Sequence, residues 1–371
     1  MLSFSVGLLA SFLVTLLIVK FSHLHGKLSA DTDLSGAQKF HTRPVPRIGG
    51  VSIVIGAMMP LLVLYFRSAG QLQPYALLIC AAIPAFVAGL AEDMTKRISP
   101  RVRLIATMAS ALLACWLLDA RVVRIDIPFI DDVLAIYIVS VCITALAVAG
   151  LANAVNIIDG FNGLAAIVTM MMLMSMLYVA YHTGDTFIVS AAAALAGAIL
   201  GFFFWNYPGG LIFLGDGGAY FIGFILAELS ILLVMRNSQV SAWYPVLMFI
   251  YPIFETLFSI YRKKILRGMS PGIPDGVHLH MLVYKRLMRW AVGSRDERHR
   301  LRRNSLTSPY LWLLSLVAVL PASLFWNNGP ILLAFVAIFV ITYVWLYWRI
   351  VRFRAPRWLI IKKAVTRRKP H

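Results

Sequence analysis

Residues 133–165 read VLAIYIVSVCITALAVAGLANAVNIIDGFNGLA, a long apolar run followed directly by a polar motif. The apolar part, about Val133–Gly150, is long enough to cross the hydrocarbon core of a bilayer as a helix. The polar part, Leu151–Ala165, carries three asparagines, one aspartate and two glycines. Polar groups beside hydrocarbon are costly unless they line a cavity or bind something, and a helix cap needs only one or two of them. The stretch therefore predicts a ligand site at a membrane surface.

The spacing of these polar residues predicts how they are presented. Asn153, Asn156 and Asp159 recur every three residues, so on a helix they project from one face. Gly160 and Gly163 follow, and glycine lets the backbone turn and approach a ligand closely.

The composition extends this prediction to the whole chain. Of 371 residues, 60% are hydrophobic and 13% are charged, whereas a soluble protein carries about a quarter charged residues. The apolar runs predict an all-α, polytopic integral membrane protein with about eleven transmembrane helices. The net charge of +18 comes from Lys and Arg in the loops beside these runs, which indicates membrane topology and not nucleic-acid binding.

The distribution of the basic residues predicts an outside N-terminus and a cytoplasmic C-terminus. Residues 1–350 are expected to form a single multi-pass catalytic domain, whose long cytoplasmic loop covers about 262–304. Residues 351–371 are expected to form a basic cytoplasmic tail. The three cysteines lie in apolar runs and show no metal or disulfide spacing.

Two further acidic motifs fall on the side predicted to be cytoplasmic. Glu92 and Asp93 precede Arg101 and Arg103, a pattern that fits either a solvated, charge-balanced loop or an acid pair with arginines that bind phosphate. Asp216 is flanked by glycines at a helix start, where a carboxylate suits a hard cation and free amides suit phosphate. The same tripeptide also makes ordinary turns.

The region after the ninth expected span, about Trp243–Tyr261, adds ionisable residues. Glu255 lies inside that span, and we expect it to pair structurally with Arg262 or Arg267. The histidines of the sequence His278-Leu-His280 share a face only in extended backbone, and no further ligands are spaced for zinc. A pair that contacts substrate or phosphate fits them better.

Together these motifs resemble the polyprenyl-phosphate N-acetylhexosamine-1-phosphate transferases of glycosyltransferase family 4, in particular the bacterial undecaprenyl-phosphate N-acetylglucosamine-1-phosphate transferases. The resemblance covers nearly the whole chain. The most specific match is the Asn-x-x-Asn-x-x-Asp-Gly motif that begins at Asn153. The supporting matches are Pro46–Gly50, Glu92-Asp93, Gly215–Ala219 and Asp275–His280.

Four positions depart from the family pattern. Glu92 and Asn162 stand where aspartates are usual, Ala219 replaces a serine, and Met281 replaces a further histidine. Glu92 keeps its charge, while Asn162 loses one. Met281 argues against the phospho-N-acetylmuramoyl-pentapeptide transferase branch, whose loop has three consecutive histidines.

The resemblance implies a Mg²⁺-dependent phospho-N-acetylhexosamine transferase, with Mn²⁺ as a possible substitute. It would move an N-acetylhexosamine-1-phosphate, GlcNAc-1-phosphate in the first instance, from a UDP-sugar to undecaprenyl phosphate and release UMP. This is the first membrane step of a cell-envelope polysaccharide such as O-antigen, lipopolysaccharide or capsule. The expected location is the bacterial inner membrane, with the active site on the cytoplasmic face and a homodimer as a possible assembly. The alternatives are the muramoyl-pentapeptide branch and, from another class, a secondary transporter.

The resemblance also implies residue roles. The metal ligands would be Asp216 and Asn156. Asp93 would orient or deprotonate the lipid phosphate, and the other catalytic candidates are Glu92, Asp159, His278 and His280. Substrate binding would fall to Asn153, Asn162, Arg101, Arg103 and Arg267.

Overall fold

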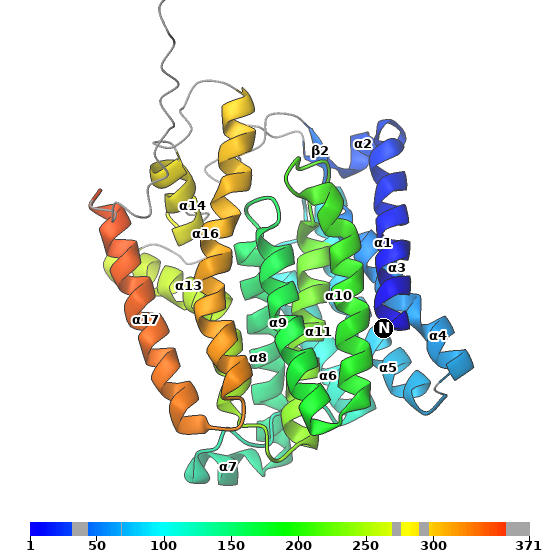
Figure 1. Ribbon diagram of the computed structural model, residues 1–371, viewed down its shortest axis with the longest axis vertical. Helices are drawn as coiled ribbons and strands as arrows, with labels where there is room; N and C mark the ends of the chain where they lie inside the picture. The colour runs from blue at the N-terminus through cyan, green and yellow to red at the C-terminus, as the bar shows by residue number, and fades with distance from the viewer. Residues whose placement is uncertain (32–43, 68, 269–275, 289–296, 354–371) are drawn as a thin grey trace, which may run out of the picture.

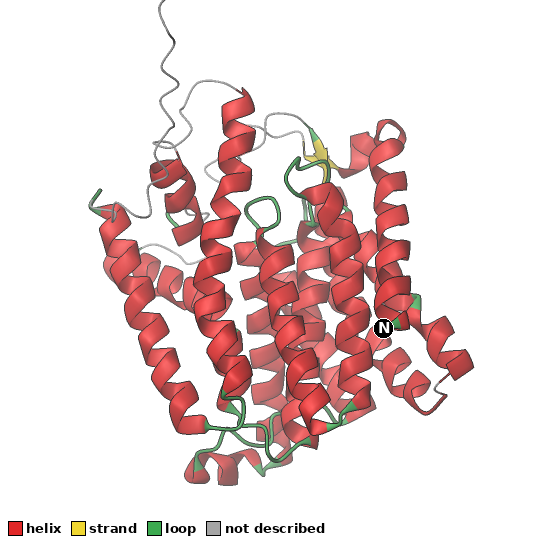
Figure 2. Cartoon of the chain, in the orientation of Figure 1, coloured by secondary structure: helices red, strands yellow, loops and turns green. Residues whose placement is uncertain are grey.

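The computed structural model describes residues 1–31, 44–67, 69–268, 276–288 and 297–353, and these residues are almost entirely helical (Figure 2). This confirms the predicted all-α membrane fold. The first half of the chain contains α1 (Leu2–Lys20), α2 (Ser22–Ser29), β1 (Ala30–Asp31), β2 (Val45–Pro46), α3 (Gly49–Met58), α4 (Pro60–Arg67), α5 (Ala69–Thr95), α6 (Pro100–Leu118), α7 (Pro128–Leu134) and α8 (Tyr137–Ile158). The second half contains α9 (Leu164–Thr183), α10 (Thr186–Asn206), α11 (Gly215–Arg236), α12 (Trp243–Met248), α13 (Ile250–Tyr261), the π-helical η1 (Arg262–Leu266), α14 (Leu279–Leu282), the π-helical η2 (Val283–Met288), α16 (Glu297–Leu324) and α17 (Gly329–Val351).

The number of membrane spans differs from the predicted eleven at one place. Ten helical spans in the described ranges are long and apolar enough to cross a membrane. The ninth expected span instead forms α12 and α13, which are divided at Phe249. Pro252 lies three residues beyond this break, and a proline ring clashes with the carbonyl four residues earlier, here that of Met248.

α11 is the central helix of the bundle. Nearly every residue of α11 is buried, and it packs against α3, α5 and α8. The backbones of α5 and α11 touch at Gly89, where a Cβ atom would lie 2.6 Å from the amide nitrogen of Gly217. This close approach places the first turn of α11 against the last turns of α5.

One end of the bundle gathers the polar motifs. The carboxyl ends of α5 and α8 and the amino ends of α6 and α11 meet there, toward the end marked by β2 and α14 in Figure 1. The short strand β2 and the start of α3 are joined to the segment before α11 at this end. Phe213 N donates to Pro46 O at 2.8 Å, and Gly49 N donates to Phe213 O at 3.0 Å. Figure 1 shows α1 rising from the marked N-terminus toward α2 at this same end.

The predicted domain organisation is covered only in part. The expected loop at about 262–304 contains η1, α14, η2 and the start of α16, but residues 269–275 and 289–296 lie outside the described ranges. The predicted tail is described only for residues 351–353. The single-domain organisation and the tail stay predictions.

Candidate active site

The carboxylate of Asp93 binds the amino end of α11. Its Oδ1 accepts a hydrogen bond from Asp216 N at 2.8 Å, and its Oδ2 accepts one from Gly217 N at 2.9 Å. The first turn of a helix has amides without partners inside the helix, and a carboxylate there satisfies them and meets the positive end of the helix dipole. Asp93 is 1% exposed, so its two oxygens are occupied and enclosed.

Asp216, in that first turn, faces two arginines. Arg47 Nη2 lies 3.1 Å from Asp216 Oδ1 and 3.5 Å from Asp93 Oδ1. Arg103, three residues into α6, contacts the other oxygen of Asp216. Asp216 is 7% exposed, so its carboxylate is largely enclosed by the protein.

Glycine is required at the turn before Asp216. Gly215 has φ +76°, a left-handed conformation that favours glycine. A Cβ atom there would lie 2.0 Å from Arg47 O and 2.5 Å from Asp93 Oδ2. Any side chain at this position would push Arg47 or Asp93 away from Asp216.

The predicted motif on α8 reaches this cluster through Tyr220. The Tyr220 hydroxyl donates to Asn153 Oδ1 at 3.0 Å, and the guanidinium of Arg103 lies over the Tyr220 ring, 5.7 Å from its centroid. Asn156 lies one turn further along α8 and is partly buried.

Asp159 follows the last residue of α8 and is partly buried. Burial raises the pKa of its carboxyl to about 7, against an opposing effect of the Arg47 charge. The charges of Asp159 and Arg47 both act on Asp93 as well, so these three groups share one electrostatic environment.

The two histidines form a second cluster with Glu255. His278 Nδ1 lies 3.0 Å from Glu255 Oε1, which also accepts a hydrogen bond from Leu279 N. The ring of His280 stacks on that of His278 at 5.3 Å, and its Nδ1 is 4.0 Å from Glu255 Oε2. Burial lowers the pKa of His280 to about 3, so its ring is neutral near pH 7. The expected pairing of Glu255 with an arginine is wrong: Arg262 donates to Val277 O instead.

His280 joins the two clusters. Its ring contacts Phe161 at a centroid separation of 5.7 Å, and a Cβ atom on Gly160 would lie 3.3 Å from His280 Nε2. The loop after α8 therefore lies between the Asp216 cluster and the histidines.

Asn162 holds this loop in place. Its side-chain amide donates to Pro208 O at 3.1 Å, its backbone amide donates to Asn304 Oδ1, and its carbonyl accepts from Ser308 Oγ. Asn162 is 3% exposed. Its contact with a nucleotide stays a prediction.

Three predicted residues lie apart from the contacts described above. Glu92 Oε2 accepts a hydrogen bond from Ile98 N at 2.7 Å and so shapes the turn between α5 and α6. Arg101, at the start of α6, and Arg267, after η1, are exposed. Their roles in substrate binding stay predictions.

The site can be compared with the ligands that a divalent cation requires. Among the described residues, no three His, Cys, Asp or Glu side chains come together as a metal site. Asp216 nevertheless offers a hard carboxylate, and Mg²⁺ is commonly held by one or two carboxylates with substrate phosphates completing its shell. The residues fit such an ion.

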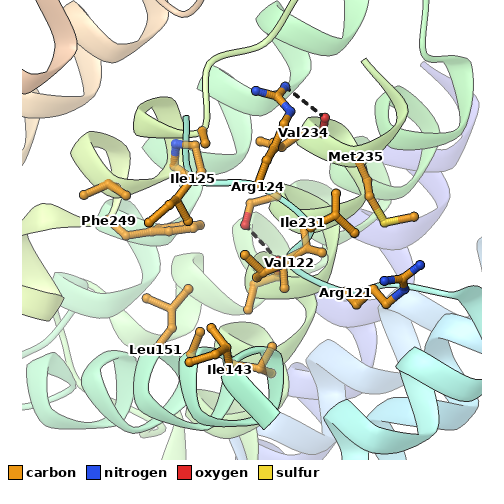
Figure 3. A pocket seen from close by; sticks show the side chains of 18 of the residues that line it. Arg121, Val122, Arg124, Ile125, Ile143, Leu151, Ile231, Val234, Met235 and Phe249 are labelled. Carbon is orange, nitrogen blue, oxygen red and sulfur yellow. Dashed lines mark hydrogen bonds between the residues drawn. The ribbon is translucent and has the colours of Figure 1, made fainter. Parts of the chain in front are cut away.

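An apolar cavity of about 260 Å³ lies further along the same helices (Figure 3). It is lined by residues 121–125, by Ile143, Ala147 and Leu151 of α8, and by parts of α11, α12 and α13. Leu151 lies about two helical turns before Asp159, which is about 12 Å along the helix axis at about 1.5 Å per residue. The cavity therefore lies between α8 and α11, toward the end of α11 opposite Asp216.

Sequence reasoning missed Arg47, Tyr220 and the true partner of Glu255. Arg47 belongs to the Pro46–Gly50 motif, but that motif predicts no role for its side chain. Tyr220 follows directly on the Gly215–Ala219 motif, one turn beyond Asp216. Helical spacing could have placed it on the same face.

Comparison with known proteins finds matches that cover these features. The model of glycosyl transferase family 4 matches residues 75–234, which include Asp93, Asn153, Asp159 and Asp216. A Bacillus subtilis protein named "Probable undecaprenyl-phosphate N-acetylglucosaminyl 1-phosphate transferase" is 27% identical over 297 residues, covering 79% of this chain and 78% of that protein. A Thermotoga maritima undecaprenyl-phosphate alpha-N-acetylglucosaminyl 1-phosphate transferase is 28% identical, covering 70% and 74%.

The muramoyl-pentapeptide branch matches over less of the chain. A Clostridium botulinum phospho-N-acetylmuramoyl-pentapeptide-transferase is 27% identical over 199 residues, covering 51% of this chain and 60% of that protein.

Proposed function

Since this chain belongs to glycosyl transferase family 4, we propose that it transfers N-acetylglucosamine-1-phosphate from UDP-N-acetylglucosamine to undecaprenyl phosphate. The products are UMP and a lipid diphosphate-sugar, the first lipid-linked intermediate of a cell-envelope polysaccharide. The acceptor and the sugar follow the names of the relatives in Bacillus subtilis and Thermotoga maritima.

The observation that carries the proposal is the position of Asp216 between Arg47 and Arg103 at the amino end of a buried helix. Phosphoryl transfer needs groups that align anions and neutralise their charge, more than groups that form covalent bonds. Two guanidiniums bind phosphate oxygens, while the carboxylate suits a hard cation.

The reaction balances without an outside reactant. An oxygen of the lipid phosphate forms a bond to the sugar-linked phosphorus of the donor, and the bond from that phosphorus to the bridging oxygen breaks. UMP leaves with the electron pair. The lipid phosphate has a second pKa of about 6, so it is largely dianionic at neutral pH and needs little help to lose a proton.

Asp93 acts through Asp216 in this arrangement. Its oxygens are taken up by the first turn of α11, so its contribution is to fix the position and direction of the Asp216 side chain. This differs from the direct role on the lipid phosphate that the family resemblance implies for Asp93. Asp216 and Asn156 would hold Mg²⁺ or Mn²⁺, which when bound supplies positive charge to the donor diphosphate.

The apolar cavity suits the isoprenoid chain of the acceptor. Its lining includes Ala147, Val148 and Leu151, which continue along α8 toward the polar cluster. A lipid whose phosphate sits at Asp216 would reach this cavity only with later isoprene units, because Ala227, the first α11 residue of the lining, lies about 16 Å along the helix from Asp216.

The active site is proposed to face the cytoplasm of a bacterium, because the loops at its end carry most of the Lys and Arg residues. An impermeant thiol reagent applied to intact cells tests this. A cysteine introduced at exposed Arg101 should stay unlabelled, while one at exposed Phe129 in α7 should react. The opposite pattern would reverse the topology.

The experiment for the activity is an assay of the purified chain with undecaprenyl phosphate and a panel of UDP-sugars. The proposal expects UMP as the nucleotide product with UDP-N-acetylglucosamine. Release of UDP would instead indicate transfer of the sugar without its phosphate.

A further inference from the structure

Arg47 is the residue of the site to which the family motifs gave no role. Its guanidinium spans the two buried aspartates, at 3.1 Å from Asp216 Oδ1 and 3.5 Å from Asp93 Oδ1. The backbone of Arg47 is also fixed, because its amide donates to Ser29 O at 2.8 Å and its carbonyl oxygen packs closely against Gly215. The side chain is 22% exposed, so part of it is accessible to a ligand.

Arg103 completes the enclosure of Asp216. It contacts the second carboxylate oxygen, so each oxygen of Asp216 has its own guanidinium. The Nε of Arg103 is buried and has no hydrogen-bond partner among the described residues. A buried donor without a partner is costly, and a ligand oxygen would satisfy it.

These contacts make the arginines competitors of a cation. With the carboxylates ionised, the charges of Asp93, Asp216, Arg47 and Arg103 cancel. A divalent ion on Asp216 must displace at least one guanidinium, and it leaves two uncompensated positive charges in a partly buried site. A diphosphate with one negative charge on each phosphate restores the balance.

We propose that Arg47 and Arg103 are exchangeable counter-ions, which bind Asp216 when no cation is present and bind the donor diphosphate when a cation takes Asp216. The inference rests on the proposed function in taking the donor to carry a diphosphate. Each arginine then competes with the cation for Asp216 and also binds the donor. Cation and donor binding then strengthen each other by the same factor.

The test is to measure two affinities for Arg47→Gln in the full-length chain, neither of which requires transfer. Mn²⁺ affinity is measured from the free-ion electron paramagnetic resonance signal without any nucleotide. The affinity for UDP-N-acetylglucosamine is measured at saturating Mn²⁺ without a lipid acceptor. The proposal expects Mn²⁺ to bind about five-fold or more tightly than in the parent chain, as typical coupling energies imply. It expects the donor to bind about ten-fold more weakly, since a charged hydrogen bond is lost.

Arg103→Gln is the second arm and should show the same opposite shifts, so the test does not depend on one variant folding. Arg236→Gln is the matched control, because Arg236 also pairs with an aspartate, Asp185 at 3.3 Å, but at the other end of α11. It should change neither affinity.

Two results would overturn the proposal. If both affinities fall, the arginines only position Asp216; if Mn²⁺ affinity is unchanged and donor affinity falls, they are simple phosphate ligands. Opposite shifts in a chain that transfers nothing would support the counter-ion exchange and reject the proposed activity, so the two failures are distinguishable.

Discussion

Asp93 and Asp216 are joined through the backbone: the Asp93 carboxylate accepts a hydrogen bond from the Asp216 amide at 2.8 Å and a second from the next amide at 2.9 Å. One acid of the site therefore fixes the helix end that presents the other. This relationship gives Asp93 a positioning role. A chemical role, as a base on the acceptor, would give the transfer rate a different dependence on pH.

Asp93→Asn should lower both stability and transfer at every pH. Asparagine presents one acceptor oxygen and one amide group to two amide donors, which leaves a buried donor unsatisfied at a cost of about 1–3 kcal/mol in the free energy of unfolding. Thermal unfolding in detergent and transfer rates from pH 6 to 9 measure the two effects. A transfer defect that shrinks above the lipid phosphate pKa of about 6 would show that Asp93 acts as a base on the acceptor.

Asp185→Asn provides the control for this variant. Asp185 also caps a helix, accepting from Ile188 N at 3.2 Å, but it lies at the far end of α11, where it pairs with Arg236. Its substitution should lower stability while transfer persists.

Asp159 should produce a titration near neutral pH. Its pKa is about 7 in the folded chain, above the unfolded value of about 3.9, so the folded state binds the extra proton between these values. Its contribution to stability is complete below about pH 4 and is lost as the pH rises through 7. The free energy of unfolding of Asp159→Asn should therefore exceed that of the parent chain by on the order of 1–2 kcal/mol at pH 8, after allowance for partial exposure. At pH 4 the two should be equal. Chemical unfolding at the two pH values measures this, and an equal effect at both would contradict the raised pKa.

Ala147→Phe should weaken the use of long acceptors. The added ring fills part of the apolar cavity, and loss of about 1.4 kcal/mol of chain binding raises the acceptor KM about ten-fold. The measurement compares undecaprenyl phosphate with a prenyl phosphate of two or three isoprene units. Leu146→Phe is the control, since Leu146 is 59% exposed on the outer face of the same helix. An equal loss with both acceptors would place the isoprenoid chain elsewhere.

Glu255 and His278 should be coupled energetically. Removal of either partner costs the other a buried hydrogen bond, so Glu255→Ala and His278→Ala should be non-additive by about 1–3 kcal/mol in a double-mutant cycle. Unfolding of the two single variants and the double variant measures this coupling. Effects that add to within about 0.5 kcal/mol would show that the contact contributes nothing specific.

The parts of the fold that the sequence predicts are those governed by local composition. The apolar lengths predict the spans, and the acid between glycines at 215–217 predicts a helix start. Pro252 favours a break in the ninth span, whereas the apolar composition of the same residues predicts one continuous helix.

Long-range partners could not be predicted in the same way. Asp93 binds an amide 123 residues later in the chain, and nothing local to either segment specifies that contact. For Glu255, the nearest basic residues in sequence were the natural partners to expect. Arg262 lies two turns further along, yet its guanidinium donates to Val277 O and to the Tyr347 hydroxyl, which leaves the carboxylate to His278.

The most direct test of the account is the nucleotide product of the purified chain incubated with UDP-N-acetylglucosamine, undecaprenyl phosphate and Mg²⁺, with Asp216→Asn assayed beside it. We expect UMP in equal amount to lipid diphosphate-sugar, and a loss of at least about 100-fold in the variant, since electrostatic groups at such sites are worth on the order of 3–4 kcal/mol. Formation of UDP in place of UMP, or full turnover by Asp216→Asn, would contradict it.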